Sequence, residues 1–554
     1  AGVPGGGLTK PFKEGAYDYA FAIGSFCYNP IKNLEIKAGN AQTFIGSGYR
    51  SLILSDNSFQ APNVNLKYTF LKKWSYQANR SRLLNLIRKT AYTTVEGYYQ
   101  PKATSRHLLN YQVNSKIQFG FSENSRISCF FSSSITAALT TFSSKFLIAI
   151  MNFVLVIVTS KYMGAEIRGE ISLVVLAIAI ITMLSEVIGG PALIYLIPKT
   201  NTKPLLLPSY LWGIASAFII SFVFNQFNLI PEGYGIHILF LGLLAIVKVS
   251  NNILLFGKKK ILPFNIIHLS YFVVLFSVVL WYIFQTNERT LMIYIKGLYA
   301  ASIIAFLLSS IFTFIYIEGN GIFPSKNHFK ILIKNGLQNQ LANMFHILTN
   351  RINFYIIGVT ALIGVYSTAI SFTEALLLFS GSSAGILMAE VAHEKNKKRS
   401  QRLTLGLAKM NFLITFLGWI FLVILPNELF TYLLGKDFES VKSVILLLGP
   451  GICFIAYKAQ MSHYFSGLGK IYINATASFC SLVINLVFAI FLIPRFGIEG
   501  AAISASISYF GALTVLGFYF KKERQIPTSF FIPQQDEINL VKEKISQMFG
   551  KKLA

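Results

Sequence analysis

Negative charge is scarce in this chain. Of its 554 residues, 23 are Asp or Glu against 49 Lys or Arg, and charged residues make up only 13% of the sequence, whereas soluble domains carry about 25%. The formal net charge of +26 would suit nucleic-acid binding, but the lysines stand mainly at the ends of apolar segments. We therefore expect no nucleic-acid partner and attribute the positive charge to membrane topology.

Motifs for chemistry are also missing. The four cysteines, Cys27, Cys129, Cys453 and Cys480, contain no C-x-x-C pair, so neither a metal site nor a disulfide framework is indicated. The sequence has no H-E-x-x-H, G-x-S-x-G or Walker A motif. We expect no catalytic residue, no metal and no cofactor, and conclude that the protein is not an enzyme.

Apolar segments are abundant from Ser144 to Phe520. Hydrophobic residues make up 53% of the chain, and the mean hydropathy is +0.55. A helix that spans the hydrocarbon core needs about 20 mostly apolar residues, and about twelve segments meet that length. We place helices near residues 142–162, 170–197, 205–225, 235–256, 263–284, 293–317, 335–358, 362–390, 405–425, 440–466, 471–493 and 498–520.

Residues 1–132 differ from the rest, since they are polar, aromatic and basic and contain no long apolar run. The alternating stretches Tyr17–Phe26 and Asn63–Phe70 predict strands, and Asn29-Pro30 predicts a turn. The segment Phe44–Asn57 resembles a motif of outer-membrane capsule-assembly β-barrel proteins. The alternative is a small β-rich soluble domain. A barrel piece joined to membrane helices is physically odd, so we expect an incomplete or chimeric gene product.

The connections between the apolar segments alternate in charge, and the basic ones mark the cytoplasmic side. The basic groups are Lys199 and Lys203; Lys258, Lys259 and Lys260; Lys326, Lys330 and Lys334; Lys395, Lys397, Lys398, Arg399 and Arg402; and Lys521, Lys522 and Arg524. Both ends of the helical part should therefore face the cytoplasm. In the charged tail 521–554, the stretch Asp536–Leu553 predicts a surface amphipathic helix.

The helical part shows signs of an internal repeat. The segment Phe256–Ile261 parallels Ser466–Ile471, and Lys248 parallels Lys458 at a similar offset. Gly189-Gly190 and Gly385 also correspond. We predict an all-α polytopic membrane protein with two six-helix pseudo-repeats, residues 133–325 and 326–520, around a central cavity, preceded by the β-rich segment 1–132. The alternative is that membrane helices resemble one another in composition.

Three segments resemble a known family. They are Gly164–Glu170, the pair Asn350–Asn353 and Gly364–Ala369, and Ile493–Ala502. All three are similar to segments of the polysaccharide-biosynthesis flippases, in the multidrug/oligosaccharidyl-lipid/polysaccharide exporter superfamily. The resemblance implies twelve helices in two lobes, a bacterial inner-membrane location, and translocation of an undecaprenyl-pyrophosphate-linked oligosaccharide for O-antigen or capsule. Implied partners are membrane lipids, protons or sodium, and the pathway's polymerase and glycosyltransferases.

Polar side chains recur along the segment near 335–358 at spacings of four, three, four and three residues, which places them on one helical face. They are Asn339, Asn343, His346, Asn350 and Asn353, with Arg351 beside them. Such a stripe cannot face lipid without a large cost. We interpret it as the lining of a substrate cavity, and helix–helix hydrogen bonding is the alternative.

Further polar residues complete the candidate set. Lys145 and Asn152 share a face of the first helix, where Lys145 either lines the cavity or extends to the interface. Lys248 and Lys458 lie inside their helices and are candidate phosphate ligands. Glu186 and Glu374 lie near mid-helix and are candidates for coupling transport to protons or sodium. Their alternative role is to pair with the cavity lysines.

Other functions are weighed against a flippase. A multidrug or cation antiporter of the same superfamily should have a cavity dominated by carboxylates, whereas the candidates here are mainly Lys, Arg, Asn and His. A membrane glycosyltransferase or polymerase would need large loops with catalytic carboxylates, and the loops are short. A surface β-barrel component would depend on residues 1–132.

Overall fold

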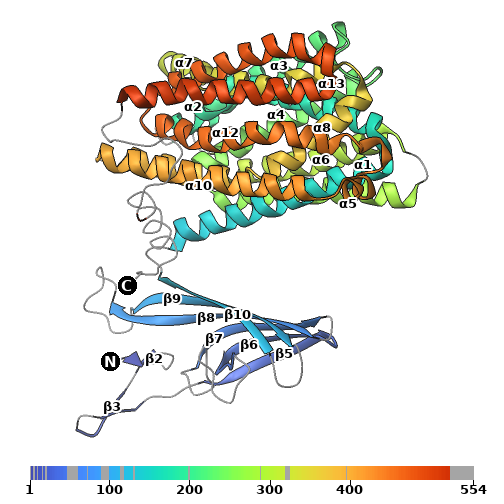
Figure 1. The fold of residues 1–554 in the computed structure, drawn as a ribbon. Coiled ribbons are helices and arrows are strands. Elements are labelled where there is room, and N and C mark those ends of the chain that lie inside the picture. Colours follow the sequence, from blue (N-terminus) through green and yellow to red (C-terminus); the bar gives the residue numbers. More distant parts are fainter. Residues whose placement is uncertain are drawn as a thin grey trace. The chain divides into compact units, whose positions relative to one another are not determined.

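The computed structural model describes residues 2–3, 7–8, 10–14, 16–18, 22–45, 60–70, 73–88, 99–112, 118–128, 132–197, 200–286, 289–317, 325–394, 396–523 and 539. The chain divides into two compact units, Ala1–Leu139 and Thr140–Ala554 (Figure 1). The sequence interpretation placed the change of character at residue 132. The barrel-like motif beyond Ile45 and, apart from Asn539, the predicted tail helix lie outside the described residues.

The N-terminal unit is built around a six-stranded antiparallel sheet in which each strand pairs with its neighbours in sequence (Figure 1). Its strands are β5 (Gly24–Ile31), β6 (Leu34–Ala41), β7 (Ala61–Phe70), β8 (Trp74–Arg88), β9 (Tyr99–Gln112) and β10 (Gln118–Ser128). Two small hairpins precede it, β1 (Gly2–Val3) with β2 (Gly7–Leu8) and β3 (Lys10–Phe12) with β4 (Ala16–Asp18).

The strand predicted at Asn63–Phe70 is confirmed as β7, but two other predictions for this unit are wrong. The predicted strand Tyr17–Phe26 is divided between β4 and β5. The predicted turn at Asn29-Pro30 lies inside β5, and the chain turns instead after Ile31. Pro30 is accepted because β5 is an outer strand whose register shifts between Tyr28 and Ile31, and edge strands and bulges tolerate proline.

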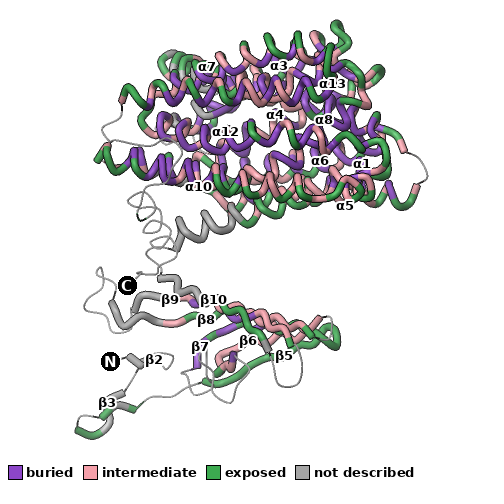
Figure 2. Tube along the Cα trace, in the orientation of Figure 1, coloured by how far each residue is buried: buried purple, intermediate pink, exposed green. Residues whose placement is uncertain are grey.

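The second unit is helical, and its buried residues run along the interior of the bundle (Figure 2). Its helices are α1 (Ser132–Gly189), α2 (Pro191–Leu196), α3 (Lys203–Gln226), α4 (Gly235–Gly257), α5 (Ile261–Gln285), α6 (Leu291–Tyr316), α7 (Lys326–Ile357), α8 (Thr360–Ala375), α9 (Leu378–His393), α10 (Lys397–Ile424), α11 (Asn427–Leu434), α12 (Val441–Gly467) and α13 (Ile471–Glu523), with the 3-10 turn η2 (Lys436–Phe438). In the described part, eight helices are long and apolar enough to cross a membrane, or nine if α8 and α9 form one span.

The two longest helices are each broken by a glycine in a non-helical conformation, Gly164 in α1 and Gly497 in α13. In α13 the Ser481 hydroxyl donates to the carbonyl of Ser508 at 2.8 Å. A straight helix would separate residues 27 positions apart by about 40 Å. The chain therefore reverses at Gly497, and the two arms of α13 pack against each other.

The same argument applies to α1. Ser160 and Ser172 lie on opposite sides of Gly164, yet they contact the neighbouring residues Thr368 and Ser367 of α8. In an unbroken helix their positions would be about 18 Å apart. The left-handed φ of 82° at Gly164 allows the chain to reverse there, because glycine has no Cβ to clash. The arms correspond to the predicted helices near 142–162 and 170–197.

Three predicted boundaries need correction. The helix expected at 170–197 stops at Gly189 and continues as the separate helix α2. The helix expected at 335–358 begins at Lys326, where Ser325 caps it by accepting from the backbone N–H of His328. The helix expected at 362–390 is divided into α8 and α9, which meet at 50°. Local apolar composition does not mark these ends.

Candidate functional site

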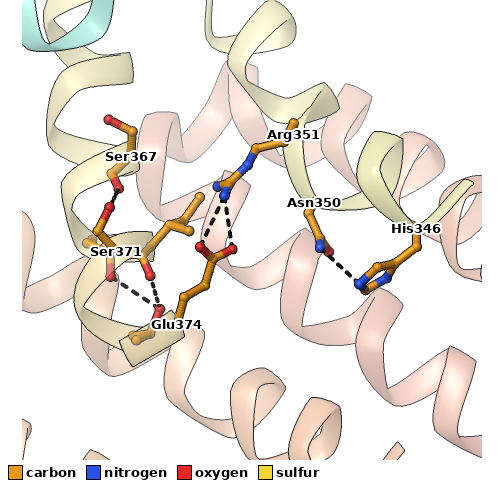
Figure 3. A network of polar contacts seen from close by, with 9 residues as sticks. His346, Asn350, Arg351, Ser367, Ser371 and Glu374 are labelled. Atoms are coloured by element: carbon orange, nitrogen blue, oxygen red, sulfur yellow. Dashed lines mark hydrogen bonds and ion pairs between the residues drawn. The ribbon is translucent and has the colours of Figure 1, made fainter. Parts of the chain in front are cut away.

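The polar stripe of α7 is only partly a continuous lining. The side chain of Asn339 lies outside the described residues. Asn343 is exposed and donates to the Gln340 side-chain oxygen at 3.3 Å. Further along the helix, His346, Asn350 and Arg351 take part in contacts with one another or with neighbouring helices (Figure 3).

Lys458 of α12 reaches the α7 stripe through His346. Its Nζ lies 3.5 Å from His346 Nδ1, and the side-chain amide of Asn350 lies 3.4 Å from Nε2. A lysine ammonium only donates, so His346 Nδ1 accepts from Lys458. The Asn350 atom that faces Nε2 is its side-chain nitrogen Nδ2, and the amide oxygen of Asn350 has no hydrogen-bond partner in the described structure. Lys458 is 8% exposed and forms no ion pair with any described residue.

Arg351 points away from this contact and pairs with Glu374 of α8 (Figure 3). One guanidinium nitrogen, Nη2, lies 3.0 Å from Oε1 and 3.1 Å from Oε2, and the guanidinium also lies over the ring of Phe354. The pair is half-buried. Glu374 is therefore neutralised by Arg351, and not by Lys248 or Lys458 as the alternative interpretation of the sequence had it.

The Arg351–Glu374 pair should be needed for stability. We expect Glu374→Gln to lower the free energy of unfolding by about 1.5–3 kcal/mol, the range for hydrogen bonds to a charged group. The exchanged pair Arg351→Glu/Glu374→Arg should recover most of that loss. Thermal unfolding of the purified protein in detergent measures both. The exposed Glu428 supplies the control Glu428→Gln, and an equal loss in the control would contradict the pairing.

Glu186 lies on the second arm of α1 and is bound to α7. It accepts a hydrogen bond of 2.8 Å from the side-chain amide of Gln340. Next to this contact the helix backbones touch, since a Cβ on Gly336 would lie 1.7 Å from the carbonyl oxygen of Val187. Glu186 forms no ion pair among the described residues, so its carboxyl group is held by an uncharged partner.

Lys248 belongs to a different polar patch, between α4 and α5. Its Nζ lies 4.0 Å from the centre of the Tyr271 ring, and a half-buried contact of 3.4 Å joins Asn252 Nδ2 and His268 Nε2 in the same region. The described contacts give Lys248 no carboxylate partner. No described contact joins this patch to the Lys458–His346 group.

Three predicted site residues lie elsewhere. Lys145 and Asn152 are exposed on the first arm of α1, although Lys145 interacts electrostatically with His268 of the Lys248 patch. Asn353 is fully buried between helices, where its amide donates to the carbonyl of Ala501 at 3.0 Å and accepts from Asn485 at 3.1 Å. This is the helix-bridging role given above as the alternative to cavity lining.

Arg168 is a candidate that the sequence interpretation missed. It lies at the start of the second arm of α1, is 8% exposed, and its Nε has no hydrogen-bond partner in the structure. It interacts electrostatically with Tyr294 and Arg351. Its segment lies between the helices predicted near 142–162 and 170–197, where a basic residue is unremarkable. Only the three-dimensional packing buries it.

Near Arg168, the backbones of α1 and α8 meet in a reciprocal contact. A Cβ on Gly169 would lie 1.9 Å from the carbonyl oxygen of Thr360, and a Cβ on Gly364 would lie 1.9 Å from that of Ala165. Three residues beyond each glycine, the Ser172 hydroxyl donates to Ser367 Oγ at 2.8 Å, across 195 residues of sequence. The same separation of 195 residues relates Gly169 to Gly364 and Ala165 to Thr360.

Two turns of the helical unit also share a local backbone structure. The turns that follow α4 and α12 have the same three backbone hydrogen bonds, and a left-handed residue at the same place, Lys259 in one and Gly469 in the other. The bonds are Lys258 N to Leu254 O, Lys259 N to Phe256 O and Lys260 N to Leu255 O, and Leu468 N to Tyr464 O, Gly469 N to Ser466 O and Lys470 N to Phe465 O.

Comparison with known proteins gives relatives of two kinds. No family model matches the sequence. The capsular polysaccharide biosynthesis protein CapF of Staphylococcus aureus is 25% identical over 166 residues, which is 29% of this chain and 41% of CapF. Agl15 of Haloferax volcanii, named as a probable low-salt glycan biosynthesis flippase, is 24% identical over 161 residues, which is 28% of this chain and 34% of Agl15. The match thus spans less than half of each relative.

Solved structures match over a much larger part of the chain. The lipid II flippase MurJ in an inward closed conformation matches with a TM-score of 0.57 and 16% identity over 75% of this chain and 92% of MurJ. An inward-facing multidrug resistance transporter of the MATE family, from the MOP superfamily, matches with a TM-score of 0.53 and 14% identity over 70% of this chain and 97% of that one. At these identities the likeness concerns the fold.

Proposed function

Because this chain is a multi-pass membrane protein with the fold of the MOP-superfamily transporters, we propose that it is a flippase for a lipid-linked oligosaccharide of the undecaprenyl-pyrophosphate type. It would carry this substrate across the inner membrane by alternating access, acting as a carrier and not as an enzyme. The names of CapF and Agl15 support a polysaccharide pathway, in which polymerase and glycosyltransferases would be its partners.

The observation that carries the proposal is the sign of the interior charge. Lys458 is buried and Lys248 is half-buried, and neither has a carboxylate partner among the described residues. A charge at membrane depth faces a cavity or a partner by default. An anionic substrate group, such as a pyrophosphate, supplies the missing partner. Glu374 is already neutralised by Arg351.

The proposed architecture has twelve crossings in two lobes. Among the eight apolar helices of the described part, α1 and α13 each supply two crossings, one for each arm, which gives ten. Helix α7 and the bent pair α8–α9 supply one crossing each. The reciprocal contact between Gly169 and Gly364 and the matched turns after α4 and α12 support a parallel repeat. The basic connections support cytoplasmic ends for this unit.

The second candidate is a cation or drug antiporter, which the MATE-family match favours at the level of fold. Its specific support is Glu186, a carboxylate bound only by the Gln340 amide in the described structure. In the flippase proposal the same carboxylate couples transport to protons or sodium. An antiporter would lose activity with Glu186→Gln and keep it when the interior lysines are removed.

The test is export of polysaccharide in a strain blocked in flipping and carrying the full chain. We expect Lys248→Ala/Lys458→Ala to lower export about thirtyfold or more, because removing a partner from a buried charged contact costs about 2–5 kcal/mol. The variant should still insert in the membrane. The control is Lys398→Ala, an exposed lysine outside the interior. Export that is unchanged in the double variant would contradict the proposal.

A further inference from the structure

Three segments of the helical unit meet at the carboxylate of Glu523, the last residue of α13. Its Oε1 lies 2.5 Å from Nζ of Lys470, in the turn between α12 and α13, and its Oε2 lies 3.8 Å from Nζ of Lys397, the first residue of α10. The side-chain amide of Gln401 also donates to the backbone carbonyl of Glu523 at 3.0 Å. The beginning of α10 and the end of α13 therefore lie side by side (Figure 1).

Positive charge exceeds negative charge at this point. Lys521 and Lys522 directly precede Glu523, and both are exposed. We call Lys397, Lys470, Lys521 and Lys522 the basic end patch. Within the part of the chain that the structure describes, Glu523 is the carboxylate that pairs with this patch. One carboxylate cannot balance all of these lysines, so the patch attracts a further anion.

The basic end patch lies where a bilayer surface would lie. Helices α10 and α13 are among those long and apolar enough to cross a membrane, and the patch occupies their ends. From Lys522 a row of exposed residues runs back along α13 at a spacing of four, through Phe518, Thr514 and Phe510. Residues four apart share one face of a helix. The row therefore leads from the lysines directly onto the surface that faces acyl chains.

An aromatic side chain stands beside the patch on the other arm of α13. Tyr472 is 61% exposed and comes two residues after Lys470, and Phe518 is 68% exposed and comes one turn before Lys522. Aromatic rings are enriched at the level of lipid headgroups. Each arm of α13 thus has an exposed ring next to a lysine of the patch.

We propose that the basic end patch binds the headgroup of an anionic phospholipid, whose acyl chains lie along the Phe518 row. Clusters of lysines at the ends of membrane helices attract anionic headgroups, and a lysine ammonium donates to phosphate oxygens. A soluble acidic partner would match the charge of the patch but would leave the apolar row unused. This surface is separate from the proposed transport site, and the inference does not depend on the transported substrate.

Glu523 sets the strength of the proposed site. Its carboxylate contacts Lys397 and Lys470, which are two of the groups that a headgroup phosphate would bind. The carboxylate and the phosphate therefore compete for the same ammonium groups. This competition predicts opposite effects of two substitutions: loss of patch lysines should weaken binding of the lipid, and neutralisation of Glu523 should strengthen it.

Quenching of a fluorescent label by lipids tests the proposal in the full-length protein. The four native cysteines are replaced by serine, and Thr514→Cys carries a bimane label within the exposed row. The protein is placed in phosphatidylcholine vesicles that contain increasing amounts of phosphatidylglycerol or of phosphatidylcholine, each with the same doxyl-labelled acyl chain. A label at Phe421→Cys, an exposed position near the other end of α10, is the control for lipid contact away from the patch, and it reports insertion of every variant.

At position 514 we expect phosphatidylglycerol to reach half-maximal quenching at a mole fraction about fivefold lower than phosphatidylcholine, the factor that one unmatched lysine supplies at a membrane surface. At position 421 the two lipids should quench equally. Lys521→Gln/Lys522→Gln should remove most of the preference at 514, and Glu523→Gln should increase it. The control Lys436→Gln/Lys442→Gln removes two lysines at the opposite end of α12 and should leave the preference unchanged.

Equal quenching by the two lipids at position 514 would overturn the proposal, because the patch would then be covered by a protein or by acidic residues of the chain's own tail. A preference that is equally strong at 421, or that survives the loss of Lys521 and Lys522, would be a general effect of a basic protein and would also overturn it. A weaker preference in Glu523→Gln would exclude Lys397 and Lys470 as ligands of the headgroup and would overturn the site.

Discussion

Oxidation of the double variant Ser172→Cys/Ser367→Cys is expected to stop transport completely, and reduction is expected to restore it. The two hydroxyl oxygens lie 2.8 Å apart, and a disulfide needs two sulfurs about 2.05 Å apart. The bond would join the second arm of α1 to α8. The alternating access proposed above requires these two helices to separate, so a covalent link would block the cycle while leaving the fold intact.

The measurement is export before and after oxidation in a protein whose four native cysteines are serine. Each single variant is a control, and both should remain active under oxidant. A protease site placed in the connection between α6 and α7 reports the cross-link, because the cleaved halves stay joined only when the disulfide has formed. A fully cross-linked protein that still exports would show that this contact does not open during transport.

The second large effect is expected from a single methyl group. In Gly364→Ala the new Cβ would lie 1.9 Å from the carbonyl oxygen of Ala165, and atoms cannot approach so closely without movement of the backbone. We expect export to fall about tenfold or more. This corresponds to an increase of about 1.4 kcal/mol or more in the free energy of the conformation in which α1 and α8 touch. A cysteine at position 172 should become more reactive toward a soluble thiol reagent.

Gly385→Ala is the matched control, because the added methyl group meets nothing within 4 Å. It should leave both export and thiol reactivity unchanged. Gly169→Ala should reproduce the effect of Gly364→Ala, since its Cβ would lie equally close to Thr360. Normal export in both variants would mean that the contact at this end is loose during transport.

Sequence patterns predicted which residues share a face of a helix better than they predicted which residues of different helices contact each other. The spacing of His346 and Asn350 placed both on one side of α7, and the structure joins them. The same pattern did not show that Arg351 would bind Glu374 or that Glu186 would bind Gln340. Helical periodicity fixes the direction of a side chain around its own axis, whereas its partner depends on how a distant helix is placed.

Arg168 and Pro30 show the same limit in other ways. Arg168 is buried because α1 and α8 approach closely at the glycines beside it, and no local pattern encodes that approach. Pro30 was interpreted as a turn because proline usually interrupts strands, but an outer strand with a register shift accepts it. The long apolar runs and the strand at β7 could be predicted, since each depends on a periodicity within one segment.

The glycine contact between α1 and α8 also constrains how this sequence can change over time. Gly169 of α1 and Gly364 of α8 each face a main-chain oxygen of the other helix, and no substitution can remove a main-chain oxygen. A larger residue at either position would therefore clash with an atom for which no compensating mutation exists. Exposed positions of the two helices are free to change, while these two glycines are expected to stay fixed.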